Sequence, residues 1–186
     1  MNEVKSLTVF VPRFLRATRC WWGKVRYRLK YVGTSTLMLA GSKISRDLFI
    51  GDYSFIASGA IIGPRVEIGN FVMFGPGVFI IGDDHNYKKV GTPSIFSGRP
   101  RLRPTIIGDD VWVGARCTIM SGITIGDGVI VAAGSVVTKD LQSCGIYAGA
   151  PATLVRMRFD EERQNELHLS ALRAGQFRKE FAGPKR

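Results

Sequence analysis

The stretch that decides the fold is residues 107–141, which read IGDDVWVGARCTIMSGITIGDGVIVAAGSVVTKDL. Every sixth residue in it is apolar: Ile107, Val113, Ile119, Ile125, Val131 and Val137. A helix repeats every 3.6 residues and a strand every two, so neither explains this period. A short strand followed by a turn does explain it. Units of this kind stack around one shared core, because none can bury its apolar face alone.

The same period runs upstream of this stretch. From residue 32 to residue 80 every sixth residue is again apolar: Val32, Met38, Ile44, Ile50, Ile56, Ile62, Ile68, Phe74 and Ile80. Eight of these fifteen positions are followed by glycine, which suits corners with unusual backbone angles. The residue four places after the apolar one is small or aliphatic in both runs. We therefore predict an all-β solenoid.

The solenoid divides the chain into three regions. We predict a basic, aromatic and partly helical arm over residues 1–31. The solenoid domain spans residues 32–154 and contains an inserted loop at residues 83–106, where the repeat is interrupted once. We predict a helical tail over residues 155–186.

Charge and composition exclude several classes of protein. The net charge is +11, yet residues 1–31 alone carry eight basic residues and one acidic residue. A nucleic-acid-binding domain would spread a basic face across its fold, so we predict no nucleic-acid partner. Three widely spaced cysteines and two histidines make neither a disulfide framework nor a metal site. No signal peptide and no apolar run of about 18 residues is present, so we predict a cytoplasmic location.

The inserted loop is where chemistry is expected. Between residues 86 and 106 it has five basic residues and no acidic one. This composition favours either an electropositive surface beside a site for an anionic ligand or an ordinary solvent-exposed loop. His85 stands at its root, and imidazole titrates close enough to neutral pH to act as a general base. We expect Asp84, Asn86 and Tyr87 to contact the substrate molecule from which His85 would take a proton. We interpret His168 as a surface residue.

The downstream repeats, together with IYAGAPATLVRMRFDEE at residues 146–162, resemble the hexapeptide-repeat acetyltransferases. They are most similar to the branch that contains the xenobiotic acetyltransferases, which act on chloramphenicol and streptogramins, and related sugar O-acetyltransferases. The resemblance covers roughly residues 45–165. It implies a left-handed parallel β-helix of about five coils. It also implies a homotrimer that binds acetyl-CoA, and no metal, in the groove between neighbouring subunits.

The resemblance also implies functions for individual residues. His85, in DDHNY at residues 83–87, matches the general base of the family. Ala115 and Ala133 match small residues that line the CoA groove, unless they are simply corner residues. Thr138 and Lys139, in VTKD, match residues that hold the cofactor beyond the pantetheine, although Lys139 also fits an ordinary exposed lysine.

Three further positions are interpreted with the family in mind. Arg156 matches a basic residue near the nucleotide phosphates. Trp112 resembles a tryptophan of the family and either flanks the cofactor or lies at the trimer contact. Cys117 occupies the small position of its hexad, so we expect it to point inwards and not to form an acyl-enzyme.

The favoured function is acetyl-CoA-dependent O-acetylation of a sugar or polysaccharide precursor. Antibiotic acetylation, N-acetylation of an amino sugar and a non-catalytic β-helix scaffold remain alternatives. A carbonic anhydrase on this fold needs three histidines, and the chain has two. The arm at residues 13–31 either contacts an anionic membrane surface, at the inner face of the membrane, or packs on the first coil and caps its edge.

Overall fold

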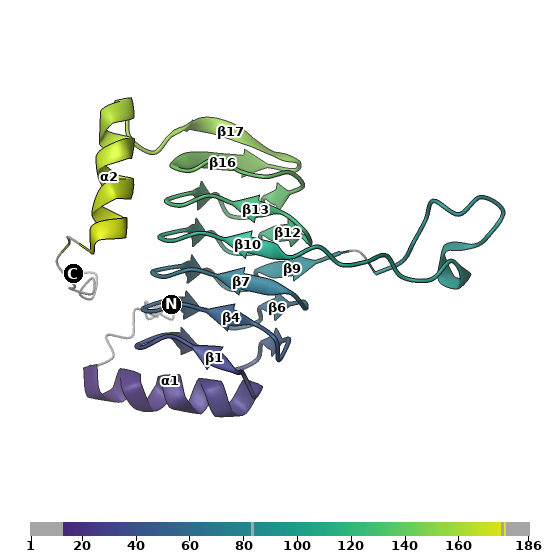
Figure 1. The fold of residues 1–186 in the computed structure, drawn as a ribbon, viewed down its shortest axis with the longest axis horizontal. Helices are drawn as coiled ribbons and strands as arrows, with labels where there is room; N and C mark the ends of the chain where they lie inside the picture. Colours follow the sequence, from purple (N-terminus) through teal and green to yellow (C-terminus); the bar gives the residue numbers. More distant parts are fainter. Residues whose placement is uncertain (1–12, 83, 176, 178–186) are drawn as a thin grey trace, which may run out of the picture.

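The computed structural model describes residues 13–82, 84–175 and 177. Its body is a parallel β-helix whose strands form three sheets, A, B and C, which the chain visits in turn (Figure 1). Sheet A contains β1 (Tyr31–Val32), β4 (Phe49–Ile50), β7 (Val66–Ile68), β10 (Thr105–Ile107) and β13 (Thr124–Ile125). Sheet C contains β3 (Lys43–Ile44), β6 (Ile61–Ile62), β9 (Phe79–Ile81), β12 (Thr118–Met120) and β15 (Val136–Val137).

Sheet B is the tallest of the three sheets. It contains β2 (Leu37–Met38), β5 (Phe55–Ile56), β8 (Met73–Phe74), β11 (Trp112–Val113), β14 (Ile130–Val131), β16 (Gly145–Gly149) and β17 (Ala152–Met157). All pairs are parallel except β16 with β17, which turn back on each other. A bridge between Ile125 and Leu141, followed by β16, begins a sixth coil. The fold class is confirmed, with five complete coils and a partial sixth where about five were expected.

The register follows the sixfold repeat directly. Neighbouring strands pair residues 18 apart, as Val32 does with Ile50 and Ile50 with Ile68. Ile68 then pairs with Ile107, so the inserted loop leaves and re-enters the stack without disturbing the register. The repeated apolar residues point inwards and form one continuous core; Phe74, Ile80 and Val113 are at most 1% exposed.

Each corner of the solenoid is named by the two sheets that it joins. At the A–B corner, between residues 108 and 111 in the fourth coil, side-chain oxygens accept backbone N–H groups of the coil below. Asn70 N–H donates to Asp109 Oδ1 at 2.7 Å, and Asp109 N–H donates to Asp127 Oδ1 at 2.9 Å. Asp52 and Asn70 continue this ladder downwards. The ladder joins successive coils by hydrogen bonds outside the sheets.

Helix α1 (Arg13–Tyr27) lies beneath the first coil and covers its edge (Figure 1). The Cys20 thiol contacts Gly33 O at 3.3 Å, and the Tyr27 hydroxyl donates to Leu39 O at 3.0 Å. Gly23 is buried, and a side chain there would meet Met38 at 3.0 Å. These contacts support the capping interpretation of the arm.

Helix α2 (Glu162–Ala174) stands alongside the stacked coils (Figure 1). It ends at Gly175, whose φ of 64° is left-handed and whose N–H bonds back to the carbonyls of Ala171 and Leu172. Neither α1 nor α2 is long and apolar enough to cross a membrane; within the described ranges no helix is.

Candidate active site

The inserted loop projects from the C–A corner after β9 and returns at β10 (Figure 1). It is held by its own contacts: Asn86 N–H donates to Gly98 O at 2.8 Å, and the Ser97 hydroxyl donates to Asn86 O. One 3₁₀ turn, η1 (Ser94–Phe96), lies near its tip. The loop is therefore a folded projection that stands away from the body.

His85 is exposed at the root of this projection. Asp84 and Tyr87 are exposed beside it, whereas the Asn86 side chain is half-buried and its Oδ1 accepts the Lys88 N–H at 3.1 Å. Asp83 lies outside the described residues. Among those described, no side chain is hydrogen-bonded to the His85 imidazole, which leaves both of its nitrogens open to an incoming group.

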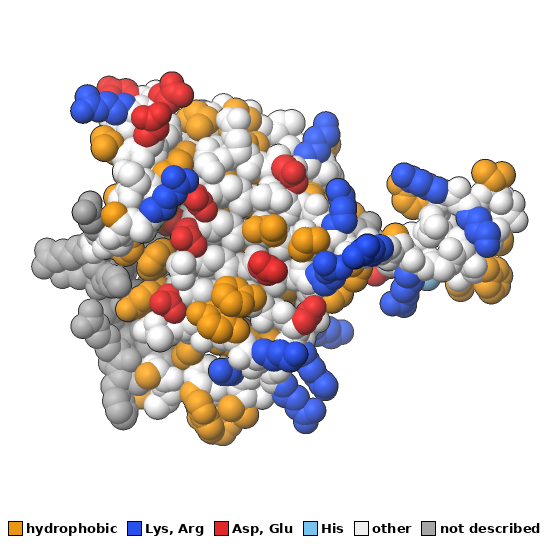
Figure 2. Space-filling model, in the orientation of Figure 1, with side chains coloured by type: hydrophobic (Ala, Val, Ile, Leu, Met, Phe, Trp, Pro, Cys, Tyr) orange, Lys and Arg blue, Asp and Glu red, His pale blue; other side chains and the backbone are white. Residues whose placement is uncertain are grey.

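Basic side chains surround the root and follow the projection. The Lys and Arg side chains stand out in the space-filling view (Figure 2); they are Lys88, Lys89, Arg99, Arg101 and Arg103, all exposed. Arg65, on the coil below, donates from Nη1 to Leu102 O at 2.8 Å and ties the returning chain to the body. The expected electropositive surface is therefore present around His85.

The predicted cofactor residues lie at two different corners. Ala115 and Ala133 stack at the B–C corner, where Gly134 N–H donates to Ala115 O at 2.8 Å. A side chain at Gly114 would meet the Ala133 backbone at 2.5 Å, so the coils approach closely there. A side chain at Gly134 would meet nothing within 4 Å, so this narrow corner is open on its outer side.

Thr138 and Lys139 lie at the C–A corner, the same corner from which the loop departs. Both are exposed, and the adjacent Asp140 accepts the Thr124 N–H at 2.8 Å. Sheet C separates them from Ala115 and Ala133. The structure thus brings Lys139 and the loop root to one corner, and places the small residues at the next.

Arg156 does not join either group. It lies in β17 opposite Ile146, near the edge of sheet B that leads from the A–B corner. Its Nη1 donates to Met157 O at 3.0 Å, and the side chain is exposed. Within one chain it therefore lies at the edge of sheet B that is remote from Ala133.

Cys117 points into the core, as predicted. It is fully buried, and its Sγ lies 3.0 Å from Ala132 O. Burial raises the pKa of the Cys117 thiol, because the thiolate would lose its hydration. A buried neutral thiol cannot take up an acyl group from a ligand at the surface.

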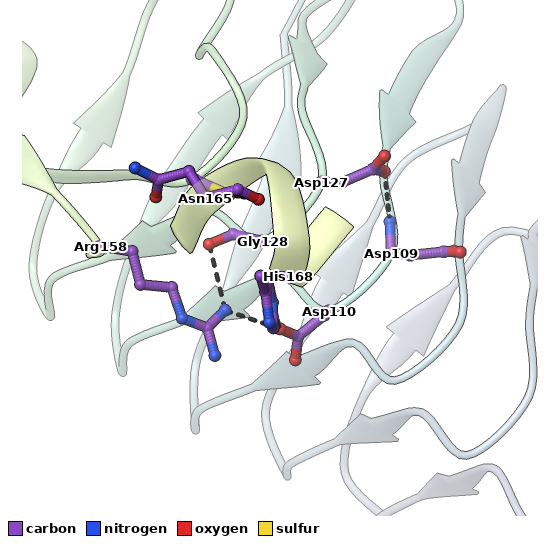
Figure 3. A network of polar contacts seen from close by, with 8 residues as sticks. Asp109, Asp110, Asp127, Gly128, Arg158, Asn165 and His168 are labelled. Atoms are coloured by element: carbon purple, nitrogen blue, oxygen red, sulfur yellow. Dashed lines mark hydrogen bonds and ion pairs between the residues drawn. The ribbon is translucent and has the colours of Figure 1, made fainter. Parts of the chain in front are cut away.

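The interpretation of His168 as a surface residue is wrong. Its Nε2 lies 2.8 Å from Asp110 Oδ2, and the Arg158 guanidinium donates to the same oxygen at 2.6 Å (Figure 3). Arg158 also donates to Gly128 O at 3.2 Å. The three side chains are mostly shielded and join α2 and the segment before it to the A–B corner. In the sequence Asp110 is 48 residues from Arg158 and 58 residues from His168, so no local pattern could reveal these contacts.

Comparison with known families decides the identity of the repeats. A model of bacterial transferase hexapeptides matches residues 41–82, and a model of the hexapeptide repeat of succinyl-transferases matches residues 104–139. The matches flank the inserted loop and follow the two runs of coils. Both runs of coils therefore carry hexapeptide repeats of the kind found in bacterial transferases. The predicted resemblance to the hexapeptide-repeat acetyltransferases is confirmed.

Known acetyltransferases are among the proteins that this chain is similar to. It is 38% identical over 117 residues to a probable macrolide acetyltransferase of Lysinibacillus sphaericus, a match that covers 55% of this chain. The chain spans 65% of that relative's length.

Two solved structures resemble it closely enough to compare. A hexapeptide-repeat acetyltransferase of Vibrio cholerae, complexed with acetyl coenzyme A, is 26% identical with a TM-score of 0.68, covering 75% of this chain and 76% of its own. A maltose O-acetyltransferase of Clostridium difficile is 27% identical with a TM-score of 0.58, covering 77% and 88%. Among its described residues, this chain has no group of three or more His, Cys, Asp or Glu placed to hold a metal.

Proposed function

We propose that the chain is an acetyl-CoA-dependent O-acetyltransferase that acts on a hydroxyl of a sugar or polysaccharide precursor. The observation that carries this proposal is the position of His85. The single break in the coils leaves its imidazole exposed among cations, in the loop that departs from the corner that also carries Lys139 two coils above. A base without a competing partner, beside a surface that attracts anions, suits proton transfer next to a phosphate-bearing donor.

The reaction needs one proton acceptor and one nucleophile. His85 takes the proton from the acceptor hydroxyl while the oxygen attacks the thioester carbonyl carbon. The carbon–sulfur bond then breaks, and the sulfur leaves as a thiolate that is finally protonated. A backbone N–H near the carbonyl oxygen would stabilise the negative charge on it. Cys117 has no part in this sequence, since it is buried.

Acetyl-CoA supplies the activated acyl group, and the chain has residues suited to it. The pantetheine arm is thin, and the B–C corner presents the small residues Ala115, Ala133 and Gly134, with the exposed Arg116 beside them. Lys139 at the C–A corner is an exposed cation for a phosphate, and so is Arg156 on sheet B. The structure of the Vibrio cholerae neighbour with acetyl coenzyme A supports the same donor here.

These residues lie at separate corners, so we propose that a complete site is formed between subunits of a homotrimer. Two apolar surfaces favour a second copy of the chain as the partner. The loop exposes Tyr87, Val90, Ile95 and Phe96, three of them by more than 70% and Val90 almost completely. In the second to sixth coils the outward side chains of sheet B are also apolar: Phe55, Met73, Trp112, Ile130 and Ile146, of which Met73 and Trp112 are 45% and 51% exposed. Exposed apolar patches of this kind mark protein interfaces, and Trp112 lies in the middle of one.

The location of the protein is also a proposal. The cysteines that the structure describes, Cys20, Cys117 and Cys144, are all unpaired thiols. Unpaired thiols are usual in a reducing compartment, and acetyl-CoA as the donor agrees with this. We propose a cytoplasmic protein.

A screen of acceptors tests the proposed activity. The full chain is mixed with acetyl-CoA and, in turn, with sugars, glycan oligomers, an amino sugar, chloramphenicol and a macrolide, and the released thiol is followed. Thiol release that depends on a saccharide hydroxyl supports the proposal. Release only with an antibiotic supports the second candidate, which the 38% identity to a probable macrolide acetyltransferase favours. No acceptor-dependent release with any compound would contradict both.

A further inference from the structure

Helix α1 presents an apolar face that the solenoid does not cover. Cys20, Gly23 and Tyr27 lie on the side that contacts the first coil. Side chains on the opposite side of the helix point away from the coils. They carry Trp21 and Trp22, which are 59% and 64% exposed, and Val25, which is also exposed. Leu15 extends this outward surface towards the start of the helix.

Cations line this apolar face on both sides. Arg19 and Arg26 lie along one flank and Lys24 along the other, and all three are exposed. Residues 13–31 contain seven basic residues and no acidic one. The apolar side chains at the lower edge of the molecule, with Lys and Arg beside them, are visible in Figure 2. An apolar stripe between two rows of cations is complementary to a surface that has an anionic outer layer over an apolar interior.

We propose that the outward face of α1 docks on an anionic lipid bilayer, with the helix lying parallel to the membrane plane. Trp21, Trp22 and Val25 would enter the boundary between headgroups and acyl chains, where tryptophan is favoured. Lys24 and Arg26 would meet lipid phosphates. The helix has 15 residues, fewer than the roughly 20 that cross a bilayer, so it lies on the surface.

A second copy of the chain is a poorer occupant of this face. A two-fold contact would place two such helices against each other, each without a single acidic residue to offset the cations. Like charges at close range oppose such a contact. In a trimer with parallel solenoids, by contrast, three α1 helices would face the same way and bind one membrane together.

Docking would set the height of the candidate active site above the lipid. The solenoid rises from α1, and the loop leaves at β9, in the third coil (Figure 1). Strands lie about 4.8 Å apart, so the loop root is about 10 Å above the first coil. Acceptors carried by the membrane, such as lipid-linked saccharides, would then be within reach. This consequence rests on the proposed function, whereas lipid binding does not.

Cosedimentation with vesicles, without acetyl-CoA, tests the docking alone. Full-length protein is mixed with sucrose-loaded vesicles of phosphatidylcholine, or of phosphatidylcholine with one third phosphatidylglycerol, at low and at high salt. We expect binding to the anionic vesicles only, with a loss at high salt because screening weakens the attraction. The double variant Trp21→Ser/Trp22→Ser should bind at least tenfold more weakly. Lys24→Glu/Arg26→Glu should also bind at least tenfold more weakly, since each cation near an anionic surface contributes about fivefold.

Matched variants on the other helix control for charge and hydrophobicity. Arg163→Glu and Leu167→Ser alter exposed residues of α2 and should bind vesicles like the wild-type chain. Circular dichroism and gel filtration show whether each variant keeps its fold and its oligomeric state. The proposal is overturned if the wild-type chain ignores anionic vesicles, if the tryptophan variant binds them equally well, or if that variant changes only the oligomeric state. Each of these outcomes leaves the acetyl-transfer proposal standing.

Discussion

The A–B corner and the C–A corner of the same solenoid differ in what they hold in place. At the A–B corner each coil is bonded to the next by the ladder of Asp and Asn side chains, and α2 closes over it through Asp110. At the C–A corner the chain leaves the stack at residue 82 and returns at Thr105 with few bonds to the body. At the second corner Asp47, Thr105 and Asp140 also accept backbone N–H groups, yet among the described residues the side chains of His85 and Lys139 form no hydrogen bond and remain for a ligand.

This difference separates the residues that stabilise the fold from those proposed to act. Both histidines show it: His168 is held against Asp110, whereas His85 is exposed at the loop root. A histidine bound to a carboxylate within the protein serves the structure. An exposed one is available to a substrate. Substitutions at the two corners should therefore affect different measurements.

The largest expected effect is on catalysis at the C–A corner. His85→Ala removes the proposed base, so acceptor-dependent thiol release should fall about 10²- to 10⁴-fold while CoA binding persists. The matched variant His168→Ala removes a histidine of the other corner and should keep turnover close to wild type. Wild-type turnover in His85→Ala would exclude His85 as the base.

The next effect is on stability at the A–B corner. In Gly108→Ala the new methyl group would collide with Asp127 Oδ1 and meet the Asp127 backbone N at 2.9 Å. Such overpacking costs about 1–3 kcal/mol, and thermal denaturation should show a lower Tm. The control is Gly98→Ala in the loop, where a side chain meets nothing within 4 Å and only the backbone strain at φ 79° remains. An equal fall in Tm for both variants would contradict the distinction between the corners.

A smaller effect is expected where α2 joins this corner. Asp110→Asn weakens the contacts with both Arg158 and His168 and should destabilise the docked helix by about 1 kcal/mol, since the pair is mostly shielded but still reached by water. Faster hydrogen exchange within residues 162–174 would report it. Arg173→Ala is the control, because that side chain is 73% exposed and 4.0 Å from Asp127. Unchanged exchange in Asp110→Asn would show that α2 is held mainly by apolar packing.

The smallest effect on turnover is expected for Cys117→Ala. The thiol faces the core, and burial raises its pKa, so at pH 8 less of it is thiolate than of a free cysteine. We expect turnover within about threefold of wild type, together with slow alkylation of Cys117 in the native chain. A loss as large as that of His85→Ala would instead assign Cys117 to the reaction.

Much of the fold could be predicted because the period of six is a local property. Apolar residues of the repeat pair 18 positions apart within each run and 39 apart across the inserted loop, so the core follows once the period and its interruption are known. The break in the period likewise marked His85 and the loop. Contacts that do not follow the repeat could not be predicted. Asp110 and His168 are 58 residues apart, and nothing in the hexad of Asp110 or in the helix of His168 indicates that they meet.

The sequence by itself determined the repeat, the register, the single interruption and the basic, aromatic character of the arm, because each depends on residue type and spacing alone. The tertiary structure decided which corner each residue occupies. It placed Lys139 at the loop's corner and Ala115, Ala133 and Arg156 elsewhere, and it turned Trp21 and Trp22 away from the coils. The physical reason is that a corner is a property of the closed coil, which exists only when strands far apart in the chain have paired.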